Sequence, residues 1–218
     1  MCARYTLTAR PDLVAELFGI DMPFDLTPRY NVAPTQNVLA ARLDPEGKRE
    51  FVKLRWGLIP SWAHDTKIGY KLINARSETV AEKPSFRSAV KNKRRCLIVA
   101  DGFFEWKAVG KKKQPYLFRQ PDGKPFAFAG LWEHWIDPND GAIESCTVLT
   151  TESNPRVAEL HDRMPVIFTT KSEFEQWLTV ADVTSMRKPL PEDALTIGPV
   201  NDVLNNARND VPECLQPV

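Results

Sequence analysis

The sequence lacks a long hydrophobic run and any pair of closely spaced cysteines. Its apolar stretches, such as residues 97–100 and 164–168, fall far short of the ~20 residues that a membrane-spanning helix needs. No basic segment followed by an apolar segment opens the chain, so no secretory signal is visible. We therefore expect a protein without membrane spans, in the cytoplasm (nucleoid-associated in a bacterium) or another intracellular compartment such as the nucleus.

The cysteines are too far apart for a zinc ribbon or a CxxC redox motif. There are four of them: Cys2, Cys96, Cys146 and Cys214. Without a secretory signal, we expect these thiols to be reduced. No metal and no cofactor is predicted.

Net charge is also nearly absent. The 29 Lys and Arg residues and 28 Asp and Glu residues give a formal charge of +1, which excludes a simple polybasic nucleic-acid binder and an acidic disordered tail. The distribution is uneven, because residues 83–113 carry ten basic and two acidic side chains. This segment is interpreted either as a solvated surface or as an electropositive surface that attracts phosphates.

Length and pattern predict one α+β domain over residues 1–218. The 18 prolines indicate a loop-rich fold, and many short strands with helices between them favour a mixed, mostly antiparallel, barrel-like sheet core with short flanking helices. Expected helices cover residues 11–18, 75–82, 85–92, 155–160 and 172–178. Expected strands cover residues 4–8, 37–43, 50–58, 96–100, 103–108 and 143–151, with a hairpin that pairs 115–119 with 125–132.

Cys2 is the first residue that could carry chemistry. A small second residue usually permits removal of Met1, which would leave an α-amine (pKa ~7.8) and a thiol (pKa ~8.5) on one residue. Such an aminothiol suits acyl transfer, with the amine as the base, or capture of an aldehyde as an imine that closes to a thiazolidine. The alternative is a small buried hydrophobe at the start of a strand.

Glu105 and His161 are candidate proton-transfer groups. Glu105 lies among Phe and Trp in residues 102–106, where lost solvation would raise the pKa of its carboxyl, unless it occupies the outward face of the strand. His161 begins the run HDRMP, in which Arg163 could bind an anion. A plain helix C-cap is the alternative for that run.

Other candidates point to phosphates and bases. Asn74 is interpreted as a helix N-cap with Arg76 in the first turn, either a phosphate site or an ordinary cap with a surface arginine. Pro34 and Trp62 lie in loops where rigid or aromatic side chains could contact unpaired bases, or pack in the core.

Eight blocks in order along the chain resemble the SRAP family of abasic-site processing proteins, first called SOS-response-associated peptidases. They are Met1-Cys2 followed by Arg4, RYNVAP at 29–34, WGLIPSW at 56–62, NARSET at 74–79, RCLI at 95–98, DGFFEW at 101–106, AGLW at 129–132 and HDRMP at 161–165.

The resemblance implies an enzyme that senses abasic sites in single-stranded DNA and forms a DNA–protein crosslink. By this likeness Cys2 is the nucleophile, Asn74 positions it, Glu105 helps to open the sugar ring, and His161 shuttles a proton or acts in a lyase or reversal step. The DNA contacts that it implies are Arg4, Asn31, Pro34, Trp62, Arg76 and Arg163. Removal of Met1 by Cys2 and Glu105 would account for the peptidase name.

Partners and alternatives follow from the same residues. We expect a monomer that acts on single-stranded DNA with abasic sites, with replication-fork proteins as further partners. A second hypothesis is an N-terminal-Cys hydrolase or thiol peptidase that uses Cys2 with His161 and needs no DNA. A third is a non-enzymatic single-strand binder that uses the basic segment.

Overall fold

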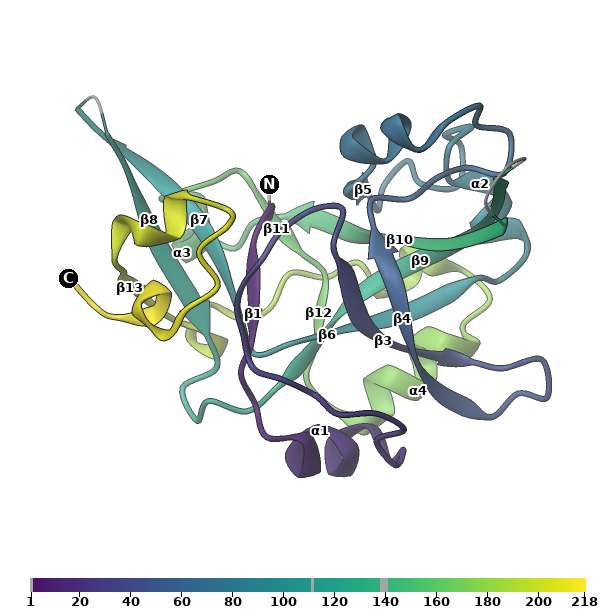
Figure 1. Ribbon diagram of the computed structural model, residues 1–218, viewed down its shortest axis with the longest axis horizontal. Helices are drawn as coiled ribbons and strands as arrows, with labels where there is room; N and C mark the ends of the chain where they lie inside the picture. The colour runs from purple at the N-terminus through teal and green to yellow at the C-terminus, as the bar shows by residue number, and fades with distance from the viewer. Residues whose placement is uncertain (1, 111, 138–140) are drawn as a thin grey trace.

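The computed structural model describes residues 2–110, 112–137 and 141–218, so Met1 and Lys111 lie outside the described residues. Two β-sheets form the centre of the molecule (Figure 1). The five-stranded antiparallel sheet has the order β13 (Thr196–Pro199), β8 (Lys112–Arg119), β7 (Gly102–Val109), β1 (Tyr5–Leu7) and β2 (Arg29–Val32).

The second sheet closes into a barrel. Strand β9 pairs with both β6 and β10, which joins the two ends of the path β10-β4-β3-β6-β9. Its members are β3 (Asn37–Leu43), β4 (Arg49–Trp56), β5 (Asn74–Arg76), β6 (Arg95–Ala100), β9 (Phe126–Asp137), β10 (Gly141–Glu152), β11 (Arg163–Pro165) and β12 (Ile167–Phe168). Most pairs are antiparallel, and β10 runs parallel to β4 and β5. The expected α+β class with a mixed, barrel-like sheet is confirmed.

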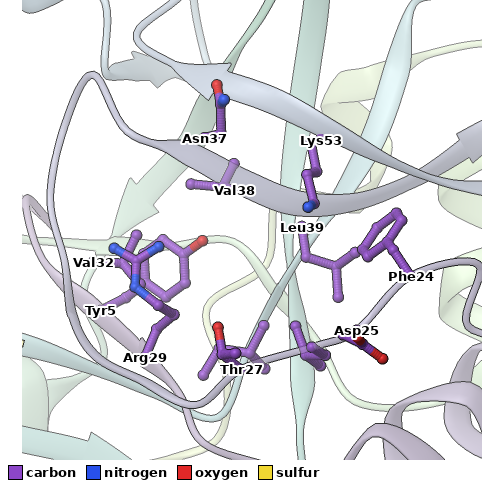
Figure 2. Close-up of a pocket in the computed structure, with 12 residues that line it drawn as sticks. Tyr5, Phe24, Asp25, Thr27, Arg29, Val32, Asn37, Val38, Leu39 and Lys53 are labelled. Carbon is purple, nitrogen blue, oxygen red and sulfur yellow. The ribbon is translucent and has the colours of Figure 1, made fainter.

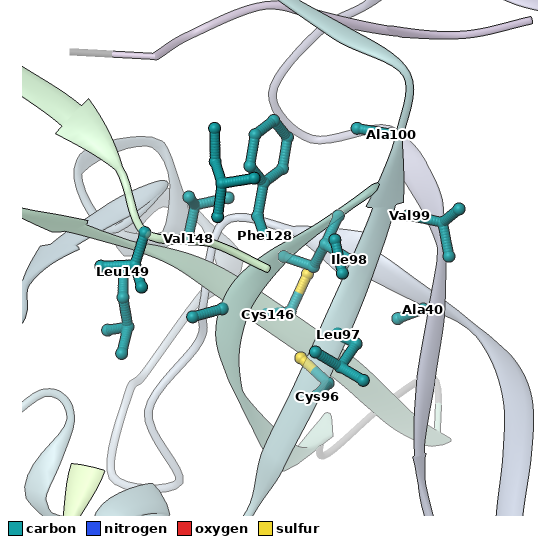
Figure 3. Packing of buried hydrophobic residues seen from close by; sticks show 14 of the residues in the cluster. Ala40, Cys96, Leu97, Ile98, Val99, Ala100, Phe128, Cys146, Val148 and Leu149 are labelled. Atoms are coloured by element: carbon teal, nitrogen blue, oxygen red, sulfur yellow. The ribbon is translucent and has the colours of Figure 1, made fainter. Parts of the chain in front are cut away.

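Aromatic side chains join the two sheets into one core. The Tyr5 ring of β1 lies 5.4 Å from Trp56 and 5.6 Å from Phe128 of the barrel, both edge-on. Edge-to-face contacts at these separations are favourable beyond the area that they bury. Figure 3 shows another part of this cluster, where the sulfurs of Cys96 and Cys146 lie among aliphatic side chains. Both thiols are fully buried and unpaired, as is typical of cysteines that act as small hydrophobes.

Short helices flank the sheets. They are α1 (Pro11–Phe18), α2 (Arg87–Lys91), α3 (Pro155–Ala158) and α4 (Lys171–Thr179), with 3₁₀ turns η1 (Thr66–Lys71), η2 (Val183–Met186), η3 (Glu192–Ala194), η4 (Asp202–Asn205) and η5 (Pro212–Leu215). Helix α1 begins with proline and ends at Gly19, whose φ of 65° is the left-handed conformation that favours glycine. Among the described residues, no helix has the length and apolar character required to cross a membrane.

Two local predictions were wrong. The expected helix over residues 75–82 is absent, because Asn74–Arg76 instead pairs in parallel with residues 148–150 of β10 and then enters turns. Asn74 is therefore not a helix cap, and no helix N-terminus lies behind Arg76. The expected hairpin of 115–119 with 125–132 is also absent, because β8 pairs with β7 and β13 while β9 enters the barrel.

Candidate functional site

Strand register brings Glu105 next to the N-terminus. Tyr5 pairs with Phe103 across β1 and β7, and the Phe104 amide donates to the Arg4 carbonyl at 3.1 Å. Continuing this antiparallel register places Glu105 opposite Ala3. Glu105, His161, Ala3 and Arg4 line one pocket of about 530 Å³. The structure thus brings both predicted proton-transfer residues, Glu105 and His161, to the residues that follow Cys2.

Cys2 is held in place by the edge of the barrel. The Asn74 side-chain amide donates to the Cys2 carbonyl at 2.8 Å, from a strand 72 residues away. The Cys2 thiol is fully buried and lies 3.6 Å from the Arg4 carbonyl. Burial, reinforced by the Glu105 carboxylate, raises the pKa of the Cys2 thiol, so it is neutral at pH 7.

Glu105 has the properties of a general acid or base. Its side chain is only 4% exposed. Burial, with a smaller contribution from the Asp162 carboxylate, raises the pKa of Glu105 from 4.5 to about 7. Both protonation states are then populated near neutral pH, which is the condition that proton transfer favours.

His161 is oriented by the backbone that follows it. Its Nδ1 accepts the Arg163 amide at 3.0 Å, which leaves the proton of the neutral ring on Nε2. Asp162 Oδ1 lies 2.9 Å from the same Nδ1 and favours the charged ring. Burial outweighs that effect and lowers the pKa of His161, so the neutral ring predominates at pH 7.

Arg4 is fixed at the pocket by two acceptors. Its Nη1 donates to Asn31 Oδ1 at 3.0 Å and to the Leu204 carbonyl at 3.2 Å, and its guanidinium lies 6.0 Å from the centre of the Trp106 ring. Asn31 itself is fully buried, and its amide also contacts the carbonyls of residues 204, 206 and 209. Asn31 therefore links Arg4 to the C-terminal segment through buried hydrogen bonds, and its side chain is not exposed to DNA in this structure.

The sequence interpretation missed the C-terminal wall of the site. Asp210 accepts the backbone amides of Tyr30 and Asn31 and forms an ion pair with Arg29. Asn205 lines the pocket and accepts the Trp106 indole N–H at 2.6 Å. These partners are about 100 to 180 residues apart, and the only local signal is the density of Asn and Asp in residues 201–210.

Arg163 is committed to the protein. It is buried, forms a two-pronged pair with Glu78 at 2.8 and 2.9 Å, and donates to the Thr150 carbonyl at 2.7 Å. Arg76 on β5 is exposed. In this geometry Arg76 is open to an anion, whereas the Arg163 guanidinium already has a carboxylate partner.

Pro34 and Trp62 do not line this pocket. Pro34 is half-buried, whereas Trp62 is 53% exposed with its indole N–H 3.4 Å from the Pro84 carbonyl. An indole that is half exposed on a loop is available for stacking on a base. Trp56, in contrast, is fully buried in the core.

A second cavity, of about 240 Å³, is lined by Tyr5 and Leu7 of β1 together with residues of β2, β3 and β4 (Figure 2). It is separate from the pocket that holds Glu105 and His161, because the two share no lining residue. Its walls hold the charged residues Asp25, Arg29 and Lys53, and it contains none of the candidate catalytic residues. Among the described residues, no cluster of three or more His, Cys, Asp or Glu could hold a metal ion.

Comparison with known proteins identifies the family of this chain. The family model for SOS response associated peptidase (SRAP) matches residues 1–207. Abasic site processing protein YoqW of Bacillus subtilis is 42% identical over 99% of both chains. Abasic site processing protein HMCES of Xenopus tropicalis is 33% identical over 86% of this chain and 65% of its own length. A crystal structure of a protein from Bacteroides thetaiotaomicron superimposes with a TM-score of 0.87 at 29% identity over the full length of both chains. This chain therefore belongs to the SRAP family.

Proposed function

We propose that this protein processes abasic sites in single-stranded DNA by covalent capture through Cys2 after removal of Met1. Relatives of 42% and 33% identity are named abasic site processing proteins. The observation that carries the proposal is that Asn74 holds the Cys2 carbonyl beside a pocket lined by Glu105 and His161.

The chemistry needs an amine, a thiol and a proton-transfer group. The freed α-amine of Cys2 attacks the aldehyde carbon of the ring-opened sugar, and the resulting carbinolamine loses water to give an imine. The Cys2 sulfur then adds to the imine carbon, and the thiol proton is transferred to nitrogen. The product is a five-membered thiazolidine plus one water, and no other reactant is required.

The pKa values of the side chains suit these steps. Glu105, with a pKa of about 7, can accept a proton from the ammonium form of the amine and return it to the departing water or the opening sugar ring. The neutral thiol of Cys2 prevents a thiolate from competing for the aldehyde first. His161, with its proton on Nε2, serves as a second proton carrier or acts in a slower lyase or reversal step.

Contacts with DNA are assigned to exposed or half-buried side chains around this chemistry. Arg4 and Arg76 bind phosphates, and Pro34 and Trp62 contact the flanking bases. Arg163 holds Glu78 and the end of β10, and Asn31 holds Arg4. Replication-fork proteins are proposed as the partners that bring this protein to abasic sites in single-stranded DNA.

Peptide hydrolysis by Cys2 with His161 is less well supported. An activated Cys–His pair requires a lowered thiol pKa, whereas burial raises that of Cys2. The cleavage that fits this site is the single removal of Met1, assisted by Glu105.

The experiment that tests the proposal compares wild type with Cys2→Ser on an abasic single-stranded oligonucleotide. Wild type should give an adduct that survives denaturing electrophoresis without borohydride. Cys2→Ser keeps the α-amine, so its imine should survive only when reduced by borohydride. Equal adduct from both proteins without borohydride would refute the thiazolidine, and no adduct from wild type lacking Met1 would refute covalent capture.

A further inference from the structure

The Tyr5 side chain has a buried hydroxyl without a partner in the described part of the chain. The residue is 1% exposed, and none of the hydrogen bonds among the described residues involves its Oη. A buried phenol usually finds a partner, because an unpaired polar group inside a protein costs free energy. Figure 2 shows the hydroxyl directed into the second cavity, of about 240 Å³, which Tyr5 lines. A ligand in this cavity would supply the hydrogen bond that the protein does not.

The same cavity has one positive charge that no carboxylate of the described residues balances. Arg29 lines it but forms an ion pair with Asp210. Lys53 also lines it and forms no ion pair with any described residue, and its Nζ lies 4.5 Å from the centre of the Phe24 ring. Asp25 is a lining residue too, but Figure 2 shows its carboxyl group turned away from Lys53. The Lys53 ammonium is therefore available to an anion in the cavity.

The rest of the wall is mostly apolar. Leu7, Val38 and Leu39 are buried, and Phe24 and Leu26 pack against the core from the segment between α1 and β2. Apolar walls favour the burial of an apolar body, whereas a few polar groups fix its orientation. The cavity therefore matches a small molecule with a compact apolar body and one anionic head.

We propose that this cavity binds a small monocarboxylate, which accepts hydrogen bonds from Tyr5 Oη and Lys53 Nζ and buries its apolar body against Leu39 and Phe24. A carboxylate accepts hydrogen bonds and donates none, which suits a phenol O–H and an ammonium. One unbalanced ammonium matches the single charge of a carboxylate rather than the larger charge of a phosphate monoester.

This binding is separate from the capture of DNA. The cavity shares no lining residue with the pocket that holds Glu105 and His161. Titrations with a small carboxylate involve no DNA, so their outcome is independent of the proposed function.

The test titrates the full-length protein with benzoate and with benzamide, its neutral isostere, and follows binding by NMR. Tyr5→Phe removes only the hydroxyl and no hydrogen bond of the described residues, so this variant should fold as wild type does. Lys53→Gln removes the unbalanced charge. The matched control, Lys48→Gln, removes an exposed lysine that pairs with Glu46 and does not line the cavity.

Wild type should bind benzoate with a dissociation constant on the order of 1 mM and with shifts of the amide signals of β1 and β3. Tyr5→Phe should weaken benzoate binding about 10-fold, since hydrogen bonds to charged groups are the stronger ones. Wild type and Lys48→Gln should both prefer benzoate to benzamide about 5-fold. Lys53→Gln should lose that preference, because the charge that distinguishes the two probes then has no partner.

Absence of benzoate binding to wild type would overturn the proposal. Equal affinity of benzoate for wild type and Tyr5→Phe would do the same, as would a preference for benzoate that survives Lys53→Gln. A loss of affinity in Lys48→Gln as large as that in Lys53→Gln would show only a general effect of surface charge, and would also overturn the site.

Discussion

Glu105→Gln should make the protein more stable at alkaline pH while slowing its chemistry. The Glu105 carboxyl is 4% exposed, and burial raises its pKa from 4.5 to about 7. The native state therefore holds this proton more tightly than the unfolded state, and the stability that it confers is complete below pH 4.5. That stability is lost as the pH rises towards 7. At about 1.4 kcal/mol per pKa unit, the loss is about 3 kcal/mol.

Urea denaturation of wild type and variant from pH 5 to 8.5 measures this difference. Because glutamine cannot ionise, the free energy of unfolding of Glu105→Gln should gain on wild type by up to about 3 kcal/mol, with the gain complete above pH 7. The exposed Glu159→Gln provides the baseline for an exposed Glu-to-Gln change. If the difference in the free energy of unfolding between variant and wild type is constant with pH, or grows towards acid, the native state does not raise the pKa of Glu105.

The same substitution should slow adduct formation about 100-fold or more and remove its pH dependence near 7. Single-turnover crosslinking across the same pH range measures this rate. A variant that crosslinks at the wild-type rate would show that Glu105 is only a buried structural acid.

Three further substitutions test the surroundings of the site. Asp210→Asn should lower the free energy of unfolding by about 1 kcal/mol at pH 7 in urea titrations, since Asp210 holds Arg29 and two backbone amides. Although burial acts to raise the pKa of Asp210, Arg29 and the amides lower it overall from its ordinary value of 3.8. The difference should therefore shrink progressively as the pH falls below that value, and a difference that grows towards acid would contradict this. Glu78→Gln should lower the free energy of unfolding by about 2 kcal/mol in the same assay, because it leaves the buried Arg163 without its carboxylate partner. The adduct yield at saturating DNA should not change. If folded Glu78→Gln protein loses the adduct, Arg163 contacts the DNA instead. Trp62→Ala should leave the free energy of unfolding within about 0.5 kcal/mol of wild type, because the side chain is half exposed. It should weaken binding to abasic single strands by about 1–3 kcal/mol in anisotropy titrations. Unchanged binding would show that Trp62 does not contact the DNA.

Local signals predicted those elements whose causes are local. Proline at the start and Gly19 at the end specify α1, and the turn residues at 44–47 join β3 to β4, two strands that were expected. The helix expected at 75–82 failed because the open edge of β10 offers Asn74–Arg76 a strand partner that no local pattern reveals. The pairing of β8 with β7, in place of β9, is likewise decided by barrel closure.

The candidate site shows the same division. The sequence motifs pointed to Asn74, Glu105 and His161, and the structure brings them to Cys2 and its neighbours. The pairing of Arg163 with Glu78 spans 85 residues, and that of Arg29 with Asp210 spans 181, so neither left a local signal. The count of charges in residues 83–113 likewise could not distinguish the buried Arg95 from exposed lysines such as Lys107, because only the fold decides which side chains are exposed to solvent.

Intact mass spectrometry of the protein with an abasic oligonucleotide tests covalent capture most directly. Without any reductant, covalent capture should give a species that lacks Met1 and has gained the mass of the oligonucleotide less one water, with the modification located on Cys2 after digestion. Free protein alone, or an adduct located on a lysine, would contradict it.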